Sequence, residues 1–154
     1  MANGIDIRLC GKDDLEAVSK LLRETWHATY DDIYGPKRVA DITSRWHSVE
    51  ALERNLALPD GVFLVAERDG RIVGTGFARF EAENKLIRCD RIYVHPDAQG
   101  TGIGYGLLGE MIARTGPADR ICLEVEPGNK RAIAFYERAG FRVIGQGTDC
   151  GGKG

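Results

Sequence analysis

The segment QGTGIG, residues 99–104, concentrates glycine at a point where the chain begins to look helical. Glycine in a helix interior costs about 1 kcal/mol relative to alanine, so the run should have a use. A glycine turn that enters a helix presents unpaired backbone N–H groups beside the positive end of the helix dipole. Without Cβ atoms at Gly100, Gly102 and Gly104, the oxygens of a pyrophosphate could approach this backbone closely. The alternative is that the glycines only allow close helix packing, and the spacing alone favours neither explanation.

Two common nucleotide-binding motifs do not fit this segment. A Walker A loop needs Lys-Ser or Lys-Thr after its last glycine, and no lysine occurs in the helix that follows. The dinucleotide fingerprint would need a glycine at position 105 or 107, which hold Tyr105 and Leu107. For the two further glycines, Gly106 and Gly109, close packing is the only explanation that the sequence offers.

The pattern Gln99-x-x-Gly102-x-Gly104 resembles the acetyl-CoA signature of the GNAT superfamily of N-acetyltransferases. The preceding residues 91–96, RIYVHP, resemble the fourth strand of that family and its exit loop. Residues 129–141, NKRAIAFYERAGF, are similar to the family's other cofactor segment. Both blocks stand in the family order and at a normal separation, which makes the pair far more specific than either block alone.

The resemblance implies direct transfer of an acetyl group from acetyl-CoA, the co-substrate, to an amine in a ternary complex. The backbone N–H of Ile92 would polarise the thioester carbonyl and stabilise the oxyanion. Tyr136 would protonate the departing thiolate. The residues implied to contact acetyl-CoA are Ile92, Tyr93, Val94, Gln99, Gly100, Thr101, Gly102, Ile103, Gly104, Tyr105, Asn129 and Tyr136.

Three side chains in this set also have a structural explanation. Tyr136 shares a helix face with alanines and could be a core aromatic. Asn129 could be a helix N-cap, alone or in addition to a cofactor contact. Gln99 could merely close the loop.

The general base is the point at which the sequence departs from the family pattern. Many relatives carry a glutamate on the fourth strand at the position of Arg88. Asp90 is the first substitute, because strand geometry should place it on the same side as Arg88 and Ile92. Glu81 or Glu83, acting through water, is the second. The alternative for Asp90 is a simple ion pair with Arg88 or Arg91.

The acceptor pocket in this family usually lies around the first two helices and the loop that joins them. Trp26, Tyr30 and Asp31, together with Glu81, are the candidate substrate contacts, and they would suit a small, polyamine-like cation. The alternative is that the loop charges are solvated and that Trp26 continues an apolar helix stripe. Two rival functions are a peptide or protein N-acetyltransferase and a non-catalytic acyl-CoA sensor.

The elements that must position these residues follow from hydrophobic periodicity and turn signals. Strands are predicted at residues 5–9, 62–66, 72–80, 87–94, 120–125 and 141–144, with a hairpin turn at Asp69-Gly70. Helices are predicted from residue 13 to Trp26, after Ser48, and at 102–114 and 129–139; the intervening segment through Tyr30, Tyr34 and Trp46 is predicted as a loop. The expected fold is mixed α and β and GNAT-like, with about six to seven strands and about four helices.

Composition limits the remaining possibilities. The 154 residues suit a single domain, 1–154, whose formal net charge of −2 gives no reason to expect a nucleic acid partner. No apolar run approaches the roughly 20 residues of a membrane span. The cysteines and histidines lack metal-ligand spacing, and the scattered cysteines indicate a reduced cytoplasm.

The end of the chain is rich in glycine. We expect residues 144–154 to be mobile unless a partner holds them, because such a tail cannot bury enough surface to offset its ordering entropy. Relatives usually carry one more strand here. A homodimer in which a neighbouring subunit covers the sheet edge is therefore expected.

Overall fold

A mixed five-stranded sheet, in the order β1-β2-β3-β4-β5, forms the frame of the computed structural model, which describes residues 4–115 and 117–144. Its strands are β1 (Ile5–Leu9), β2 (Gly61–Arg68), β3 (Arg71–Glu81), β4 (Leu86–Val94) and β5 (Arg120–Cys122). The first four strands pair antiparallel, and β5 pairs parallel with β4. The predicted mixed class with a partly parallel second half is confirmed.

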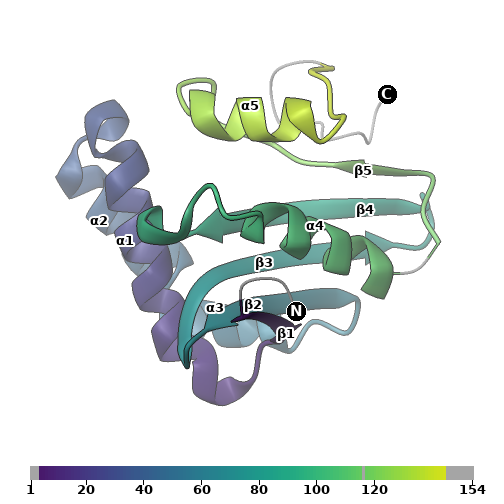
Figure 1. The fold of residues 1–154 in the computed structure, drawn as a ribbon, viewed down its shortest axis with the longest axis horizontal. Coiled ribbons are helices and arrows are strands. Elements are labelled where there is room, and N and C mark those ends of the chain that lie inside the picture. Colours follow the sequence, from purple (N-terminus) through teal and green to yellow (C-terminus); the bar gives the residue numbers. More distant parts are fainter. Residues whose placement is uncertain (1–3, 116, 145–154) are drawn as a thin grey trace.

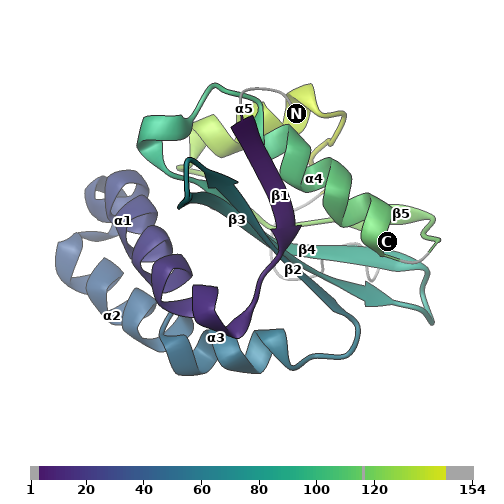
Figure 2. The same ribbon diagram turned by 60° about the horizontal axis from the view of Figure 1, so that its bottom comes forward.

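Five α-helices surround the sheet (Figures 1 and 2). The helices α1 (Leu15–Tyr34), α2 (Pro36–Trp46) and α3 (Val49–Leu56) lie on one face, and α4 (Ile103–Arg114) lies on the other. The helix α5 (Lys130–Arg138) lies beyond β5. Two short 3-10 turns, η2 (Lys12–Asp14) and η3 (Pro96–Ala98), precede α1 and α4.

Local sequence signals explain several element boundaries. Asp69 and Gly70 take φ values of 54° and 76°, the left-handed pair that a tight hairpin turn between β2 and β3 requires. The Ser48 side chain accepts a hydrogen bond from the Ala51 N–H at 3.2 Å and caps α3, as predicted.

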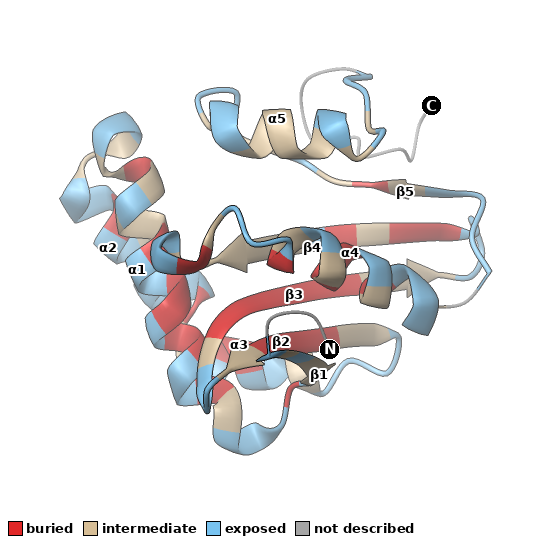
Figure 3. Cartoon of the chain, viewed as in Figure 1, coloured by how far each residue is buried: buried red, intermediate tan, exposed pale blue. Residues whose placement is uncertain are grey.

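Two apolar clusters pack on opposite faces of the sheet. On the α1 face, Leu15, Val18 and Leu22 contact a cluster that includes Phe63 and Phe77. On the α4 face, a second cluster contains Ala78 and Cys89 from the sheet and the buried side chains Ile103, Leu107 and Met111 from α4. Figure 3 shows the buried residues concentrated along β2, β3 and β4. The central strands are therefore covered on both faces, and this close packing keeps β4 in a fixed position.

The structure corrects the predicted loop between the first two helices. Instead of a loop, α1 continues to Tyr34 and α2 occupies residues 36–46. Gly35, with a φ of 88°, separates the two helices, and its N–H donates to the Asp31 carbonyl at 2.9 Å. Pro36 then opens α2 at a position where a missing N–H costs nothing.

Strand and helix counts also differ from the prediction. The described residues contain five strands and five α-helices, rather than six to seven strands and four helices. The strand β5 stops at Cys122 instead of Val125, and residues 141–144 form no strand. The predicted glycine-rich tail lies outside the described residues, apart from Ile144.

Candidate active site

An open strand edge forms where β4 and β5 separate. The two strands pair only through Leu86 with Arg120, Ile87 with Ile121 and Arg88 with Cys122. Beyond these pairs β4 continues to Val94, whereas the chain leaves β5 toward α5 (Figure 1). Within the described residues, the second half of β4 therefore has a strand neighbour only on its β3 side. Such an edge can pair with an extended ligand by backbone hydrogen bonds.

Hydrogen-bond alternation identifies the backbone groups at this edge. The His95 N–H donates to the Val73 carbonyl at 2.8 Å across the β3–β4 ladder. Because bonded and non-bonded pairs alternate in an antiparallel ladder, the backbone of Tyr93 faces β3, and that of Ile92 and Val94 faces the open edge. The Gln99 side chain donates to the Val94 carbonyl at 3.0 Å, so Gln99 does close the loop. The Ile92 N–H is left directed at the opening, as its implied role requires.

The glycine turn lies directly beyond this strand. Gly100 and Gly102 have φ values of 81° and 84°, a region that favours glycine, and a Cβ at either position would meet nothing within 4 Å. Gly102 caps α4, and the Gly106 N–H is the donor to its carbonyl. The first N–H groups of the helix have no partner one turn earlier, so this open turn can hold an anion.

Gly104 and Gly106 serve packing. A Cβ on Gly104 would lie 2.9 Å from a ring carbon of Phe135, and a Cβ on Gly106 would lie 2.7 Å from the Ile7 side chain. Gly104 thus allows α5 to approach α4. A Cβ on Gly109 would meet nothing within 4 Å, so the packing explanation is confirmed for Gly106 and is wrong for Gly109.

A cluster of aromatic side chains connects α1 with β4 near the open edge. The ring centroid of Trp26 lies 4.4 Å from that of Tyr30 and 6.4 Å from that of Tyr93 on β4. Asn129 links this cluster to α5, because its Nδ2 donates to the Tyr30 hydroxyl at 3.0 Å. Its Oδ1 also accepts from the Ala132 N–H at 3.1 Å, so the predicted N-cap is confirmed.

Tyr136 lies on α5 between Phe135 and Phe141, with ring centroids 5.0 Å and 5.5 Å away. Burial raises the pKa of Tyr136, and the nearby Cys89, Tyr93 and Tyr30 raise it further. The hydroxyl therefore stays protonated at neutral pH and remains a donor. These neighbours place Tyr136 at the junction of β4, α1 and α5.

The candidate base Asp90 does not lie as predicted. A bulge in the β3–β4 register pairs Phe77 with Arg91 and Ala78 with Cys89, and leaves Asp90 without an opposite residue. Arg91 then lies over the rings of Phe63 and Phe77 on the α1 face, whereas Ile92 packs against the cluster on the α4 face. Asp90 is the extra residue of the bulge, so the alternation that would place it on the same side as Ile92 is lost, and the expected shared side is wrong.

Asp90 and Glu81 are both engaged in ion pairs. Asp90 binds Arg79 at 2.7 Å and 2.9 Å, rather than Arg88 or Arg91. Glu81 accepts from Arg88 at 2.9 Å, and this contact lowers the pKa of Glu81. Asp31, a predicted substrate contact, lies 2.7 Å from His27 on the same helix.

Several residues near this site were not singled out from the sequence. The Tyr34 hydroxyl donates to Glu126, which raises the pKa of Tyr34 to about 12. His47 and Arg91 are buried polar groups on the α1 face. Only Arg91 carried a signal, since an arginine inside an apolar strand is unusual.

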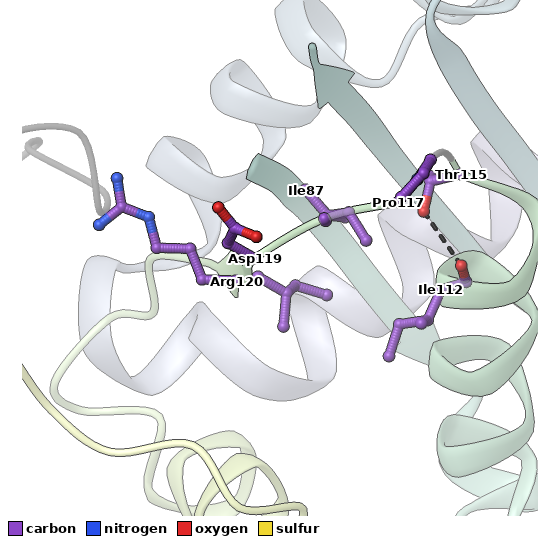
Figure 4. Close-up of a pocket in the computed structure, with 8 residues that line it drawn as sticks. Ile87, Ile112, Thr115, Pro117, Asp119 and Arg120 are labelled. Atoms are coloured by element: carbon purple, nitrogen blue, oxygen red, sulfur yellow. Dashed lines mark hydrogen bonds between the residues drawn. The ribbon is translucent and has the colours of Figure 1, made fainter. Parts of the chain in front are cut away.

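The structure also contains a cavity that lies away from the open edge of β4. A cavity of about 410 Å³, lined by Ile87, Ile112, Thr115, Pro117, Asp119 and Arg120 among others, opens near the start of β4 (Figure 4), at the far end of that strand from the glycine turn. Residues 4–115 and 117–144 contain no group of acidic, histidine and cysteine side chains that could hold a metal ion. Among the same residues, no helix is long and apolar enough to cross a membrane.

Two parallel strands that part before a glycine turn, with a half-buried tyrosine on the helix that follows the second strand, are the arrangement expected of a coenzyme A-dependent acyltransferase. The family model described as the acetyltransferase (GNAT) family matches residues 15–141, and the chain belongs to this family. The protein is therefore an acyltransferase of the N-acetyltransferase class.

Individual relatives agree with this assignment. An acetyltransferase of Pectobacterium atrosepticum is 31% identical over 153 residues, which cover 95% of this chain and 91% of the relative. A phosphinothricin N-acetyltransferase of Alcaligenes faecalis is 29% identical, with 90% of this chain and 71% of the relative covered. The crystal structure of PaiA N-acetyltransferase from Thermoplasma acidophilum, in complex with coenzyme A, superposes with a TM-score of 0.84 at 26% identity, covering 95% of this chain and 94% of that one.

Proposed function

We propose that this acetyltransferase moves the acetyl group of acetyl-CoA to the primary amine of a small molecule, by direct attack in a ternary complex. The observation that carries the proposal is the open edge at Ile92, which the glycine turn follows in the chain and whose strand, β4, carries the Tyr136 neighbours Cys89 and Tyr93. The small-molecule acceptor is supported by relatives such as the phosphinothricin N-acetyltransferase.

The residues of the opening fit the donor. The backbone N–H groups at the start of α4 would hold the pyrophosphate, and the absence of a Cβ at Gly100 and Gly102 leaves room for it. The exposed backbone of Ile92 and the Val94 N–H would pair with the pantetheine arm as an added strand does. The thioester of the bound donor supplies the acetyl group.

In the transfer step, two hydrogen-bond donors of this chain would act on the thioester, one at its oxygen and one at its sulfur. The Ile92 N–H would donate to the thioester oxygen and stabilise the negative charge that forms when the amine attacks. The Tyr136 hydroxyl, kept protonated by its raised pKa, would donate to the sulfur as the carbon–sulfur bond breaks and the thiolate leaves.

Deprotonation of the acceptor amine remains assigned to Asp90 as the first candidate. A lysine-like amine has a pKa of about 10.4, so most of it must lose a proton before it can attack. Asp90 would act through water, because its carboxylate is held by Arg79. The ion pair occupies both carboxylate oxygens of Asp90, and we expect activity to rise with pH as the amine itself deprotonates.

The test is release of free thiol from acetyl-CoA, measured with a panel of small amines and peptides between about pH 7 and 9. Release that depends on a small amine supports the proposal. Faster release with peptides favours the peptide acetyltransferase. Tight acetyl-CoA binding without amine-dependent release identifies the sensor module instead.

A homodimer and a cytoplasmic location stay predictions. The short edge strand β5 and the exposed side chains of Val143 and Ile144, 75% and 69% accessible, support a subunit contact at this edge. Solution scattering should give the mass of two chains, and a monomer would contradict the homodimer.

A further inference from the structure

An unpaired arginine stands in the first turn of α5. Arg131 is the second residue of this helix and is exposed. Its side chain takes part in no hydrogen bond or ion pair with a described residue. The first turn of α5 contains no acidic residue, so no carboxylate of that turn offsets the charge. A cation is unfavourable here, because the start of a helix is the positive end of its dipole.

The other arginine of α5 has an explanation that Arg131 lacks. Arg138 lies in the last turn, where the negative end of the dipole favours a cation. The two arginines are seven residues apart, so they project from the same face of the helix, two turns from each other. Arg131 lacks the favourable dipole interaction of Arg138, and a bound anion would supply a favourable one.

The topology of the sheet brings α5 to the glycine turn. Because β4 and β5 are parallel neighbours, the helices that follow them, α4 and α5, begin at the same end of the sheet (Figure 1). The ring centroid of Phe135 on α5 lies 4.7 Å from that of Tyr105 on α4, and a Cβ on Gly104 would lie 2.9 Å from the same Phe135 ring. Phe135 therefore stands level with the first turn of α4.

Arg131 lies one helical turn before Phe135. Residues four apart in a helix project from nearly the same face and are separated by about 6 Å along its axis. Arg131 therefore projects from the face of α5 that meets α4, and it stands one turn before the level of Gly104. The chain that leads into Gly104 at that level is the glycine turn, with Gly100 and Gly102. Helical side chains also tilt toward the start of their helix, which carries the guanidinium toward this turn.

The glycine turn and the loop before it provide no cation of their own. Residues 95–105 contain neither arginine nor lysine, and the carboxylate of Asp97 is exposed. The Nε2 of His95 lies 3.2 Å from Glu24 and is already engaged. The turn thus offers a pyrophosphate only backbone N–H groups. Coenzyme A carries a further anion, the 3′-phosphate of its ribose, with a charge of about −1.5 to −2 at neutral pH.

Resting on the proposed function, we propose that Arg131 binds the 3′-phosphate of acetyl-CoA and thereby selects the phosphorylated coenzyme over its 3′-dephospho form. The pyrophosphate and the 3′-phosphate are joined through one ribose, so with the pyrophosphate at the glycine turn the 3′-phosphate lies no farther than one sugar away. The planar fork of arginine donates two parallel hydrogen bonds to a phosphate. A phosphate at the first turn of α5 also meets the positive end of the helix dipole.

Coenzyme A and 3′-dephospho-coenzyme A isolate this contact, because they differ only in that phosphate. In isothermal titration calorimetry, the wild type should bind the dephospho form with a Kd about 5- to 20-fold higher. Equal Kd values would overturn the inference and leave the acetyltransferase assignment intact. If neither ligand binds and acetyl-CoA does not bind either, the proposed function itself fails.

Substitutions on α5 assign the preference to one side chain. Arg131→Gln should reduce the ratio of the two Kd values to within about twofold, through weaker binding of coenzyme A alone. Arg131→Lys keeps the charge without the fork and should retain only part of the ratio.

Two neighbouring cations provide matched controls. Lys130→Gln and Arg138→Gln each remove one positive charge from an exposed position of α5 that has no side-chain partner within residues 4–115 and 117–144. Lys130 projects from a different face than Phe135, and Arg138 lies two turns farther from the glycine turn than Arg131. Both variants should keep the wild-type ratio. A loss in either control as large as that in Arg131→Gln would indicate diffuse attraction by α5 and would overturn the inference.

Thermal unfolding separates a binding role from a structural one. Without ligand, Arg131→Gln should unfold at the same or a slightly higher temperature, because it removes a cation from the first turn of a helix. Coenzyme A should stabilise this variant less than it stabilises the wild type, whereas the dephospho form should stabilise both proteins equally. A ligand-free variant that unfolds at a lower temperature and loses affinity for both ligands alike would assign Arg131 a structural role and overturn the inference.

Discussion

Asn129 offers a stability test whose expected size follows from two hydrogen bonds of its side chain. Its Oδ1 accepts from the Ala132 N–H at 3.1 Å, and its Nδ2 donates to the Tyr30 hydroxyl at 3.0 Å. Losing an N-cap costs about 1 kcal/mol, and leaving the hydroxyl of Tyr30, which is 4% exposed, without its partner costs about 1–2 kcal/mol. Asn129→Ala should therefore lower the free energy of unfolding by about 2–3 kcal/mol, which for a chain of this length shifts Tm by about 4–12 °C.

Urea and thermal unfolding of five proteins, the wild type and four variants, would resolve the two contributions. Asn129→Ser keeps a capping oxygen but is too short to reach Tyr30, so it should lose only about 1–2 kcal/mol. A double-mutant cycle of Asn129→Ala with Tyr30→Phe should show a coupling of about 1 kcal/mol. If Asn129→Ala unfolds within about 0.5 kcal/mol of the wild type, or the coupling is zero, the link between α1 and α5 does not have the strength inferred from its geometry.

Three further predictions concern the leaving group, the cofactor turn and acid stability. Tyr136→Phe should lower kcat about 10- to 100-fold in steady-state assays and leave acetyl-CoA binding nearly unchanged; equal activity would remove Tyr136 from the acid role. Gly102→Glu should abolish the thermal shift produced by acetyl-CoA, because it introduces a negative charge and a strained φ at the turn; a retained shift would contradict the anion site. Burial lowers the pKa of His47 to about 3 in the folded protein, whereas an unfolded histidine has a pKa of about 6.5. Below about pH 6.5 the unfolded state therefore binds a proton that the folded state does not. The contribution of His47 to the free energy of unfolding is fully present above that pH and should fall by up to about 1.4 kcal/mol per pH unit below it. Urea unfolding of His47→Asn between about pH 6.5 and 5 should show a flatter profile, and an unchanged slope would assign the acid sensitivity to other groups.

Local signals predicted much of the fold. The turn at Asp69-Gly70, the cap at Ser48 and the strand at residues 5–9 each depend on neighbouring residues, and all three are confirmed. The segment predicted as a loop also carried a local signal. Gly35 followed by Pro36 marks the end of one helix and the start of the next, but the aromatic and acidic residues around it concealed the helical pattern.

The positions of the charged side chains could not be predicted, because they depend on long-range register. The bulge at Asp90 follows from the pairing of β3 with β4 and reverses the face expected for Asp90 relative to Ile92. The contact between Asn129 and Tyr30 joins residues 99 positions apart. The unpaired state of Arg91 became visible only once Arg79 was seen to bind Asp90.

The absence of a strand at residues 141–144 also depends on the rest of the sheet rather than on the local sequence. A strand forms only where a neighbour accepts its backbone hydrogen bonds. The chain leaves β5 after Cys122, so no partner edge lies beside Phe141 within the described residues. Apolar β-branched residues such as Val143 and Ile144 therefore remain exposed, although their sequence favours a strand.

Direct transfer from donor to acceptor is tested most directly by a single-turnover reaction. Enzyme loaded with acetyl-CoA labelled in the acetyl group would be mixed with an amine acceptor, quenched at intervals, and analysed for label in the amine, the thioester and the protein. Labelled amide should appear in step with free coenzyme A, and the protein should carry no label. Bound acetyl-CoA that stays intact in the presence of every acceptor, or label that accumulates on the protein before it reaches the amine, would contradict direct transfer at Ile92.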